Sequence, residues 1–281
     1  MLLSALLCAA PALADTYRNC GEDWRAAAPS RIVALNQHAA DLVLALGAGP
    51  ALVGVAYLDD TAAGQRQSVY FGVPVIARQY PASEVLYAQK PDLVIGGFAT
   101  AFGDGVTSRS GLARNGVGSY LLESACNGHS LDYFAHVRND LLTLGKLLHQ
   151  QQKTQALIDS MEKDIASARA LAGTAKPLSV FYLDSEVKGL DSEGRRGFVT
   201  PLLAAAGARN VFADINLYRV TVNSETLLAS DPDVILLADA EWSPARRKRY
   251  LLTHDPVVVA TARGAREPND RHPFHSPAAD L

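Results

Sequence analysis

The chain has 281 residues, of which 48% are hydrophobic and 20% are charged, and its formal net charge at pH 7 is −3. This length suffices for one large domain or for two lobes that each bury a core, and the composition excludes a disordered chain. The small negative charge gives no reason to expect a nucleic-acid partner. The densest basic run, residues 246–249, is expected on the exposed face of a helix.

Residues 1–14 are typical of a secretory signal peptide. An apolar run covers residues 2–10, and Ala12-Leu13-Ala14 has the small-x-small form of a cleavage site. The run is too short to span a bilayer, and no Lys or Arg precedes it, so either the true start lies upstream or the signal is weak. Cys8 is not expected to carry a lipid, because Leu7 is larger than such sites usually tolerate. We therefore expect an exported, periplasmic protein without a lipid anchor.

Two cysteines, Cys20 and Cys126, remain after removal of residues 1–14. In an oxidising compartment two cysteines are a natural pair. A bond between them would close a loop of about a hundred residues and stabilise the fold by about 3–4 kcal/mol. The alternative is two separate buried thiols. We expect the disulfide.

Residues 15–129 alternate between short apolar runs and short helical patterns. Strands are expected at 31–35, 52–56, 92–95 and 119–122, and helices at 39–46, 84–89 and 108–114. Residues 69–76 contain Gly and Pro and are expected to form a loop that ends in a short strand. The alternation predicts an N-terminal lobe in which helices cover both faces of a mostly parallel sheet.

One apolar stripe then recurs at steps of three and four residues, which predicts a helix over 130–149. Its members are Phe134, Val137, Leu141, Leu144 and Leu148. No Gly- or Pro-rich linker separates the two halves of the chain, so this helix is expected to join the lobes. A second helix follows and ends near Gly173. Because a helical connection is stiff, we expect lobes that tilt only slightly.

Residues 150–263 are expected to form a C-terminal lobe of the same kind. Strands are predicted at 178–183 and 234–237, and helices at 199–206 and 243–252. Gly207 ends the helix at 199–206, as Gly47 ends a helix of the first lobe.

A twelve-residue segment occurs twice. Residues 83–94 read SEVLYAQKPDLV and residues 224–235 read SETLLASDPDVI, at a constant offset of 141. Each copy predicts a short helix, a Pro-Asp pair and a buried strand, and the repetition indicates two similar α/β lobes. It also places Glu84 and Glu225 at equivalent positions. A carboxylate at a helix N-terminus contributes about 0.3–1 kcal/mol, but a symmetric pair of carboxylates also suits docking to a two-fold partner that carries Arg or Lys.

Catalytic signatures are scarce. The glycines at 47 and 49 follow a helix, whereas a dinucleotide fingerprint must follow a strand and open a helix. The sequence has neither a nucleophile elbow nor a phosphate-binding loop. The seven histidines are scattered, and for a bare metal ion only His38, Asp59 and Asp60 are candidates. We therefore predict no resident metal, no cofactor and no enzymatic activity.

Aromatic and small polar residues gather after the predicted strands, where open α/β sheets bind ligands. Such residues suit a bulky, partly aromatic ligand, although each one alone could equally be core or rim packing. Candidates in the first lobe are Asn36, His38, Tyr57, Tyr80, Phe98 and Phe102. Candidates in the second lobe are Tyr182, Tyr218, Arg219 and Trp242.

The order of several motifs resembles the substrate-binding proteins of ABC importers for iron complexes and cobalamin. The motifs are SRIVALN at 30–36, ALGA at 45–48, VGVAY at 53–57 and the two repeated segments, and the likeness extends over about residues 19–259. Asn19-Cys20-Gly21, residues 57–60 and Cys126 resemble a subgroup associated with iron–siderophore uptake.

The resemblance implies a monomeric carrier that holds a metal chelate between its lobes and delivers it to an ABC permease. It also implies that Glu84 and Glu225 contact arginines of the permease dimer. Three alternatives stay open: a haem carrier with His38 or Tyr57 as axial ligand, a binder of bare metal ions or cobalamin, and an enzyme on the same scaffold.

The end of the sequence departs from this family. The family pattern calls for a final strand and a long helix after residue 258, whereas residues 264–281 are polar and rich in Pro and His. A frameshift is one explanation, because reading one base later allows an apolar strand. In that case the second lobe would lack its last helix and expose apolar surface.

Overall fold

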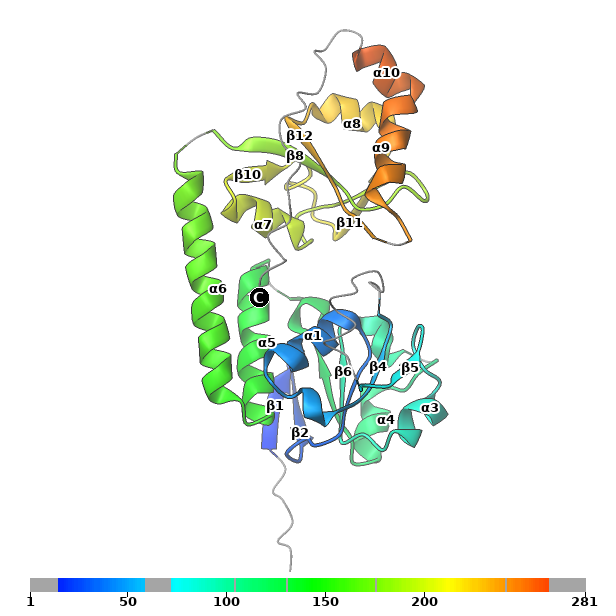
Figure 1. The fold of residues 1–281 in the computed structure, drawn as a ribbon, viewed down its shortest axis with the longest axis vertical. Coiled ribbons are helices and arrows are strands. Elements are labelled where there is room, and N and C mark those ends of the chain that lie inside the picture. The colour runs from blue at the N-terminus through cyan, green and yellow to red at the C-terminus, as the bar shows by residue number, and fades with distance from the viewer. Residues whose placement is uncertain are drawn as a thin grey trace, which may run out of the picture. The chain divides into compact units, whose positions relative to one another are not determined.

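The computed structural model describes residues 15–58, 72–103, 105–129, 131–174, 176–240 and 242–262. It divides into two compact units (Figure 1). The first unit comprises Met1–Lys176 with Phe198–Gly207, and the second comprises Pro177–Gly197 with Ala208–Leu281. The predicted signal peptide and residues 264–281 lie outside the described residues, so the frameshift hypothesis stays a prediction.

The first unit begins with an antiparallel hairpin, β1 (Asp15–Asn19) and β2 (Glu22–Ala26), which the sequence did not predict. Its side chains bind the backbone of β7 (Gly118–Leu121). The Tyr17 hydroxyl donates to the Ser119 carbonyl at 2.5 Å, and the Asn19 side chain bonds the Leu121 carbonyl and amide at 2.8 and 2.9 Å. Cys20, at the turn of the hairpin, forms a disulfide with Cys126 at a Cα–Cα distance of 5.1 Å.

A five-stranded parallel sheet forms the centre of the first unit, in the order β5-β4-β3-β6-β7. The other strands are β3 (Ile32–Ala34), β4 (Leu52–Ala56), β5 (Val75–Ala77) and β6 (Leu93–Gly96). Short 3-10 turns are η1 (Gly49–Ala51), η2 (Ala99–Phe102) and η3 (Glu123–Ala125). Because neighbouring strand residues point to opposite faces, Ile32 joins one apolar cluster and Val33 joins another.

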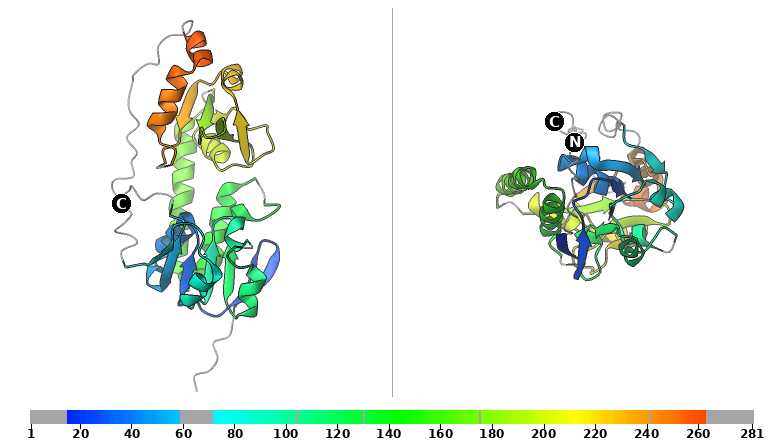
Figure 2. Two further views of the ribbon diagram at one scale, coloured as in Figure 1. Left: turned by 90° about the vertical axis from the view of Figure 1, so that its right-hand side faces the viewer. Right: turned by 90° about the horizontal axis from the view of Figure 1, so that it is seen from below.

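Helices cover both faces of this sheet (Figure 2). The first cluster takes in α1 (Gln37–Ala45) and α5 (Tyr133–Leu147), and the second takes in α3 (Ser83–Ala88) and α4 (Arg109–Arg114). Side-chain caps set two of the helix starts, since Ser108 accepts from the Gly111 amide and Asp132 from the Ala135 amide, both at 3.0 Å. The prediction of a mostly parallel α/β lobe is confirmed here.

The helix predicted over 130–149 does not join the two units. It is α5, and its stripe residues Leu141, Leu144 and Leu148 are buried in the first cluster. The chain instead reaches the second unit through α6 (Gln151–Ala172), which lies beside α5 (Figure 1). Gly145 permits this close approach, because a Cβ there would lie 1.8 Å from the Thr154 hydroxyl oxygen. The boundary expected at residue 150 therefore lies after Lys176.

One helix of the later sequence also packs in the first unit. This is α7 (Val199–Ala205), which contacts α6. Just before it, the Phe198 ring lies 5.8 Å from the ring of Tyr133. Sequence reasoning assigned the segment to the C-terminal lobe, because local patterns do not reveal which core a short helix joins.

The second unit contains a three-stranded parallel sheet in the order β10-β8-β12 and an antiparallel pair, β9 and β11. The strands are β8 (Leu178–Leu183), β9 (Leu190–Glu193), β10 (Ala208–Asn210), β11 (Arg219–Val222) and β12 (Val234–Leu237). The helices are α8 (Ser224–Ser230), α9 (Ala245–His254) and α10 (Pro256–Ala262). The rings of Phe181 and Phe212, 5.5 Å apart, are part of its apolar core.

The sequence repeat is also a repeat of hydrogen bonds. In the first unit the Asp92 carboxylate accepts from the Ser30 amide and hydroxyl at 2.8 and 2.9 Å. In the second, Asp233 accepts from the Ser179 amide and hydroxyl at 2.7 and 2.8 Å. Each Pro-Asp pair thus ties the start of one parallel strand to the start of its neighbour.

The two repeated strands differ in their surroundings. β6 is buried throughout and lies between β3 and β7. β12 pairs only with β8 among the described residues, and Val234, Ile235 and Leu236 are 42, 38 and 45% exposed. An apolar run of this kind is normally covered on both faces in a parallel sheet. In the described part of the second unit, this edge of the sheet is therefore open and apolar.

Candidate functional site

In the first unit, Asn36 connects three loops that follow strands. The residue comes directly after β3 and is fully buried. Its Oδ1 accepts from the Gly97 amide at 2.9 Å, and its Nδ2 donates to the Tyr80 hydroxyl at 3.2 Å. The Tyr80 hydroxyl also bonds the Thr100 hydroxyl at 2.9 Å. Asn36 therefore fixes the Tyr80 phenol at the carboxyl edge of the sheet.

Tyr57 lies against Tyr80, with ring centroids 5.0 Å apart. It follows β4 and has a backbone φ of +53°, and its carbonyl accepts from the Gln37 amide at 3.2 Å. A bulky residue in the left-handed region is uncommon and costs on the order of 1–3 kcal/mol unless its surroundings hold it there. The Tyr57 ring thus lies beside Tyr80, and its contact with a ligand stays a prediction.

His38 and Phe98 form the next part of the same surface. His38 is exposed in the first turn of α1, and its ring meets the Phe98 ring edge-on at 4.8 Å. Gly97 makes room for it, because a Cβ there would lie 2.0 Å from the imidazole Nε2. Sequence reasoning missed Gly97 and Thr100 as members of this surface, although the paired glycines after β6 were a signal for a close approach.

Phe102 differs from these residues. Its half-buried ring packs against the second apolar cluster of the first unit. The Arg109 guanidinium lies 5.8 Å from this ring and 3.9 Å from the Trp24 ring. Phe102 thus packs into this apolar cluster, and its direct contact with a ligand stays a prediction. We call His38, Tyr57, Tyr80 and Phe98, together with the buried Asn36 that holds Tyr80, the first aromatic surface.

In the second unit, Arg219 is held by two carboxylates. Its guanidinium lies 3.2 Å from Asp184 and 3.4 Å from Asp191. Burial opposes the charge of Asp191, but hydrogen bonds from Ser185 at 2.5 Å and Thr221 at 2.6 Å, with the nearby Arg219, hold the pKa of Asp191 below its ordinary value. Arg219 is still half exposed, so it can pair with an anionic group of a ligand.

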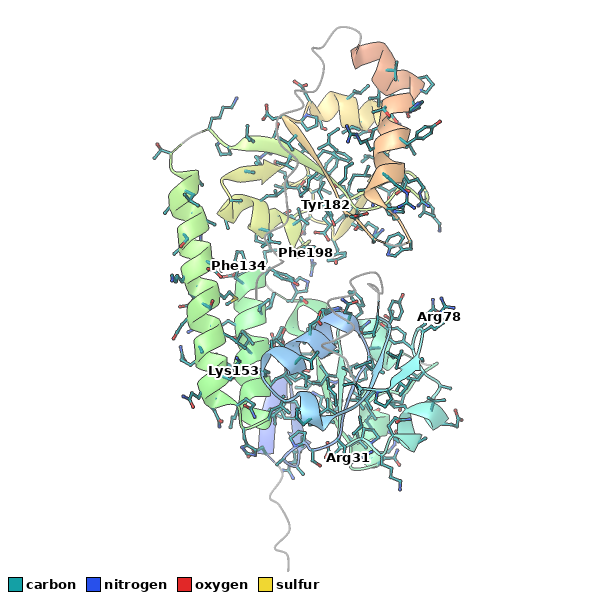
Figure 3. All side chains as sticks on the ribbon, in the orientation of Figure 1. Arg31, Arg78, Phe134, Lys153, Tyr182 and Phe198 are labelled. Atoms are coloured by element: carbon teal, nitrogen blue, oxygen red, sulfur yellow. A yellow bond between two sulfur atoms is a disulfide. The ribbon has the colours of Figure 1, made fainter. Side chains whose placement is uncertain are left out.

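Tyr182 shares Asp184 with Arg219, Tyr218 precedes Arg219 in the chain, and Trp242 is the third aromatic candidate of the second unit. Tyr182 is largely buried in β8 (Figure 3), and its hydroxyl donates to Asp184 at 3.3 Å. Burial, and next the charge of Asp184, raise the pKa of Tyr182 above its ordinary value, so the phenol stays protonated. Tyr218 and Trp242 are 50 and 51% exposed. We call Tyr182, Tyr218, Arg219 and Trp242 the second aromatic surface.

The two repeated glutamates are exposed in the first turns of their helices. Glu84 opens α3 and Glu225 opens α8. Asn223 caps α8 by accepting from the Thr226 amide at 2.9 Å. Glu225 also borders a surface cavity of about 330 Å³, together with Asp255. Neither glutamate makes a hydrogen bond or ion pair with the rest of the described chain, so both carboxylates are available to a partner.

The described residues contain no group of three or more His, Cys, Asp or Glu side chains that could hold a metal ion. Asp59 and Asp60, the other candidates for a bare ion, lie outside the described part of the chain. Within that part, no helix has the length and hydropathy needed to cross a membrane.

Comparison with known proteins decides the family. The sequence profile described as periplasmic binding protein matches residues 32–262, which is most of the chain. The chain belongs to the periplasmic binding protein family. This family consists of non-enzymatic, substrate-binding transport proteins, and membership implies an extracytoplasmic location. The predictions of family and fold class, and of a binding protein in place of an enzyme, are confirmed.

Solved structures give the same fold. A periplasmic binding protein from Veillonella parvula superposes with a TM-score of 0.74 at 21% identity, over 89% of this chain and 88% of that one. An ABC-type Fe3+-hydroxamate transport system from Saccharomonospora viridis superposes with a TM-score of 0.73 at 26% identity, over 88% of this chain and 87% of that one. The periplasmic haem-binding protein RhuT from Roseiflexus superposes with a TM-score of 0.56 at 28% identity, over 74% of this chain and 76% of that one. No curated protein matches the sequence.

Proposed function

We propose that this periplasmic binding protein captures a ferric chelate of the siderophore type and delivers it to an ABC permease. The first aromatic surface carries the proposal. Its rings are those of His38, Tyr57, Tyr80 and Phe98, and Asn36 fixes the Tyr80 phenol. Such a surface suits a bulky ligand with a polar, partly aromatic exterior. The solved Fe3+-hydroxamate protein, at 26% identity, supports the same ligand class.

The second aromatic surface contributes a charged group to the same task. Arg219 is the half-exposed cation there, and Asp184 and Asp191 fix its position. A guanidinium held in this way pairs well with carboxylate or chelate oxygens. We infer that Arg219 contributes to the affinity for the chelate.

Titration of the mature chain tests this function. A ferric trihydroxamate, a ferric catecholate, haem and cobalamin are added separately, and the fluorescence of Trp24 and Trp242 is followed. We expect a ferric siderophore to bind in the micromolar range or tighter. Tyr80→Phe and Arg219→Met should each weaken binding, by about ten-fold for the loss of one hydrogen bond or ion pair. Tyr250→Phe and Arg246→Met, at exposed positions of α9, are the matched controls.

Haem is the second candidate, because His38 is exposed next to Phe98 and Tyr57 stands beside Tyr80. An imidazole or a phenol can serve as an axial ligand of haem iron. Haem that binds with a shifted Soret band, lost in His38→Ala or in Tyr57→Phe, would favour this function over siderophore capture. Binding of none of the four probes would refute both functions.

We further propose that Glu84 and Glu225 dock on arginines of the permease dimer. Reversing both charges, Glu84→Arg with Glu225→Arg, should abolish uptake while the affinity for the chelate in solution stays unchanged. Glu162→Arg, on the exposed side of α6, is the control for a general charge effect. Loss of chelate affinity in the double variant would show that these glutamates bind ligand instead.

A further inference from the structure

A short loop of the second unit presents Trp242 to solvent. The loop leads from β12 to α9, with Ala238 at its beginning and Ser243 at its end, and Glu241 lies outside the described residues. Ala240 and Ser243 pair with each other through backbone hydrogen bonds of 3.4 and 3.1 Å. Half of the Trp242 surface is exposed, so packing on the indole does not explain how the loop keeps its shape.

A buried lysine holds both ends of this loop. Lys248, on α9, is completely buried. Its Nζ donates to the Ala238 carbonyl at 2.8 Å and to the Ser243 carbonyl at 2.5 Å. One ammonium group therefore fixes the first and the last carbonyl of the loop at the same time.

A buried glutamate completes the arrangement. The Glu186 side chain, 4% exposed, accepts from the Ser243 hydroxyl at 2.7 Å and from the Arg247 guanidinium. The same guanidinium donates to the Trp242 carbonyl at 3.3 Å. Trp242 and Ser243 are thus each hydrogen-bonded to this charged group of residues. We call Glu186, Arg247 and Lys248 the loop clamp.

Burial of a charged pair is a poor way to gain stability. Removing two charges from water costs several kcal/mol, and well-packed apolar residues of similar size often stabilise a fold at least as much. What a charged, hydrogen-bonded cluster supplies is a defined geometry for the groups that it contacts. Here those groups are the carbonyls on either side of an exposed tryptophan.

We propose that Lys248, supported by Glu186, is a positioning residue that holds Trp242 in a fixed orientation for ligand binding. The ligand-binding part of this inference rests on the proposed function, whereas the positioning part does not. A loop ordered before binding loses little conformational entropy when the ligand arrives, and the affinity rises accordingly.

Fluorescence of Trp242 tests the positioning without any ligand. In a Trp24→Phe background, Trp242 is the only tryptophan. Lys248→Met removes the ammonium and keeps much of the side-chain volume. We expect a larger fast component in the anisotropy decay and about two-fold stronger acrylamide quenching, as for a loop released into local motion. Lys248→Arg should restore part of the order, and Arg249→Met, an exposed cation on the same helix, should change nothing.

The outcomes separate positioning from general stability. Urea denaturation of each variant reports the stability of the fold. Increased Trp242 motion in a folded Lys248→Met variant supports the proposal, and unchanged motion overturns it. Should Lys248→Met not fold, Glu186→Gln decides in the same assay, because it keeps the shape of Glu186 and removes the charge. Unchanged Trp242 motion in that variant would also overturn the proposal.

Titration with a ferric trihydroxamate then tests the link to binding. Lys248→Met should lower the affinity about ten-fold, the loss expected when a charged hydrogen bond no longer orders a binding group. Equal affinities in the wild type and in Lys248→Met would overturn the binding role. If the wild type binds none of the chelates, the proposed function fails, and the anisotropy of Trp242 still decides whether Lys248 positions the loop.

Discussion

Replacement of Asp140 by Asn should make the protein more stable at neutral and alkaline pH. Asp140 lies on α5 and is 4% exposed. Its Oδ1 accepts from the Tyr120 hydroxyl at 2.8 Å and from the Glu123 amide at 3.0 Å. Asn has the same shape and keeps an oxygen for both donors, so the substitution removes the charge and little else.

The magnitude follows from the pKa of Asp140. Burial is the largest cause and raises this pKa from 3.8 to about 7. Because one pKa unit corresponds to about 1.4 kcal/mol, ionisation of Asp140 costs the folded state up to about 4 kcal/mol. The nearby Glu123 adds to the rise, and its carboxylate lies 4.0 Å from the His136 imidazole.

The free energy of unfolding changes with pH in the direction opposite to that expected for a typical surface carboxylate. Between pH 4 and pH 7 the unfolded chain has lost the Asp140 proton and the folded protein keeps it. Unfolding therefore releases a proton, and the free energy of unfolding falls as the pH rises from about 4 to about 7. The full stabilising effect of the bound proton is present below pH 4 and is lost above pH 7. The asparagine side chain of the variant does not titrate.

Urea denaturation at pH 4.5, 6 and 8, at constant ionic strength, measures the effect. The difference between the two proteins should be small at pH 4.5, and the variant should be more stable by up to about 4 kcal/mol at pH 8. Asp159→Asn, at an exposed position of α6, is the control and should show no such trend. A difference that stays constant with pH, or a variant that is less stable at pH 8, would refute the reasoning.

Three further predictions concern other parts of the chain. Replacing Cys20 and Cys126 by Ser removes a bond across 106 residues and should lower the free energy of unfolding by about 2–5 kcal/mol in denaturant titrations. Gly97→Ala should displace the His38 ring and weaken chelate or haem binding, with an unchanged far-ultraviolet circular dichroism spectrum. Ile235→Glu, on the open edge of β12, should lower the tendency of the concentrated protein to aggregate in light-scattering measurements, because apolar strand edges pair with other chains.

The repeat made the fold predictable from the sequence. A Pro-Asp pair after a short helix recurs because each carboxylate binds the amide and hydroxyl of a serine at the start of the neighbouring strand. This contact between neighbouring strands requires the same residue types in each unit, so they occur in both halves of the sequence. The apolar strands between the repeats follow from burial on both faces of the sheet.

The boundary between the units could not be predicted in the same way. The stripe from Phe134 to Leu148 indicates a helix with one buried face, but not the core that this face joins. It joins the first cluster, and α6, with only Thr154 and Ile158 buried, leads on to β8. A polar helix gives a weak periodic signal, so the sequence pattern indicates the more amphipathic α5 as the connection.

The candidate site was predictable only in part. Residues that follow strands were found, because chain position alone places them at the carboxyl edge of a parallel sheet. The contacts that support them were not predicted, since Gly97 acts through the space that it leaves for His38, and Lys248 acts through the carbonyls of Ala238 and Ser243 in the loop before its helix. The hairpin at 15–26 was missed for a related reason, because Tyr17 and Asn19 bind the backbone of a strand about a hundred residues later.

The repeated segment also separates residues that serve the fold from residues that do not. Leu86 and Leu227 are buried, and Asp92 and Asp233 bind neighbouring strands, so the fold explains why these residues recur. Glu84 and Glu225 are exposed and bind nothing within the described chain. Their interaction with the helix dipole contributes only about 0.3–1 kcal/mol, and Asp or Ser would serve there as well. The occurrence of glutamate at both positions without a structural need is the observation behind the proposed docking of Glu84 and Glu225 on a partner.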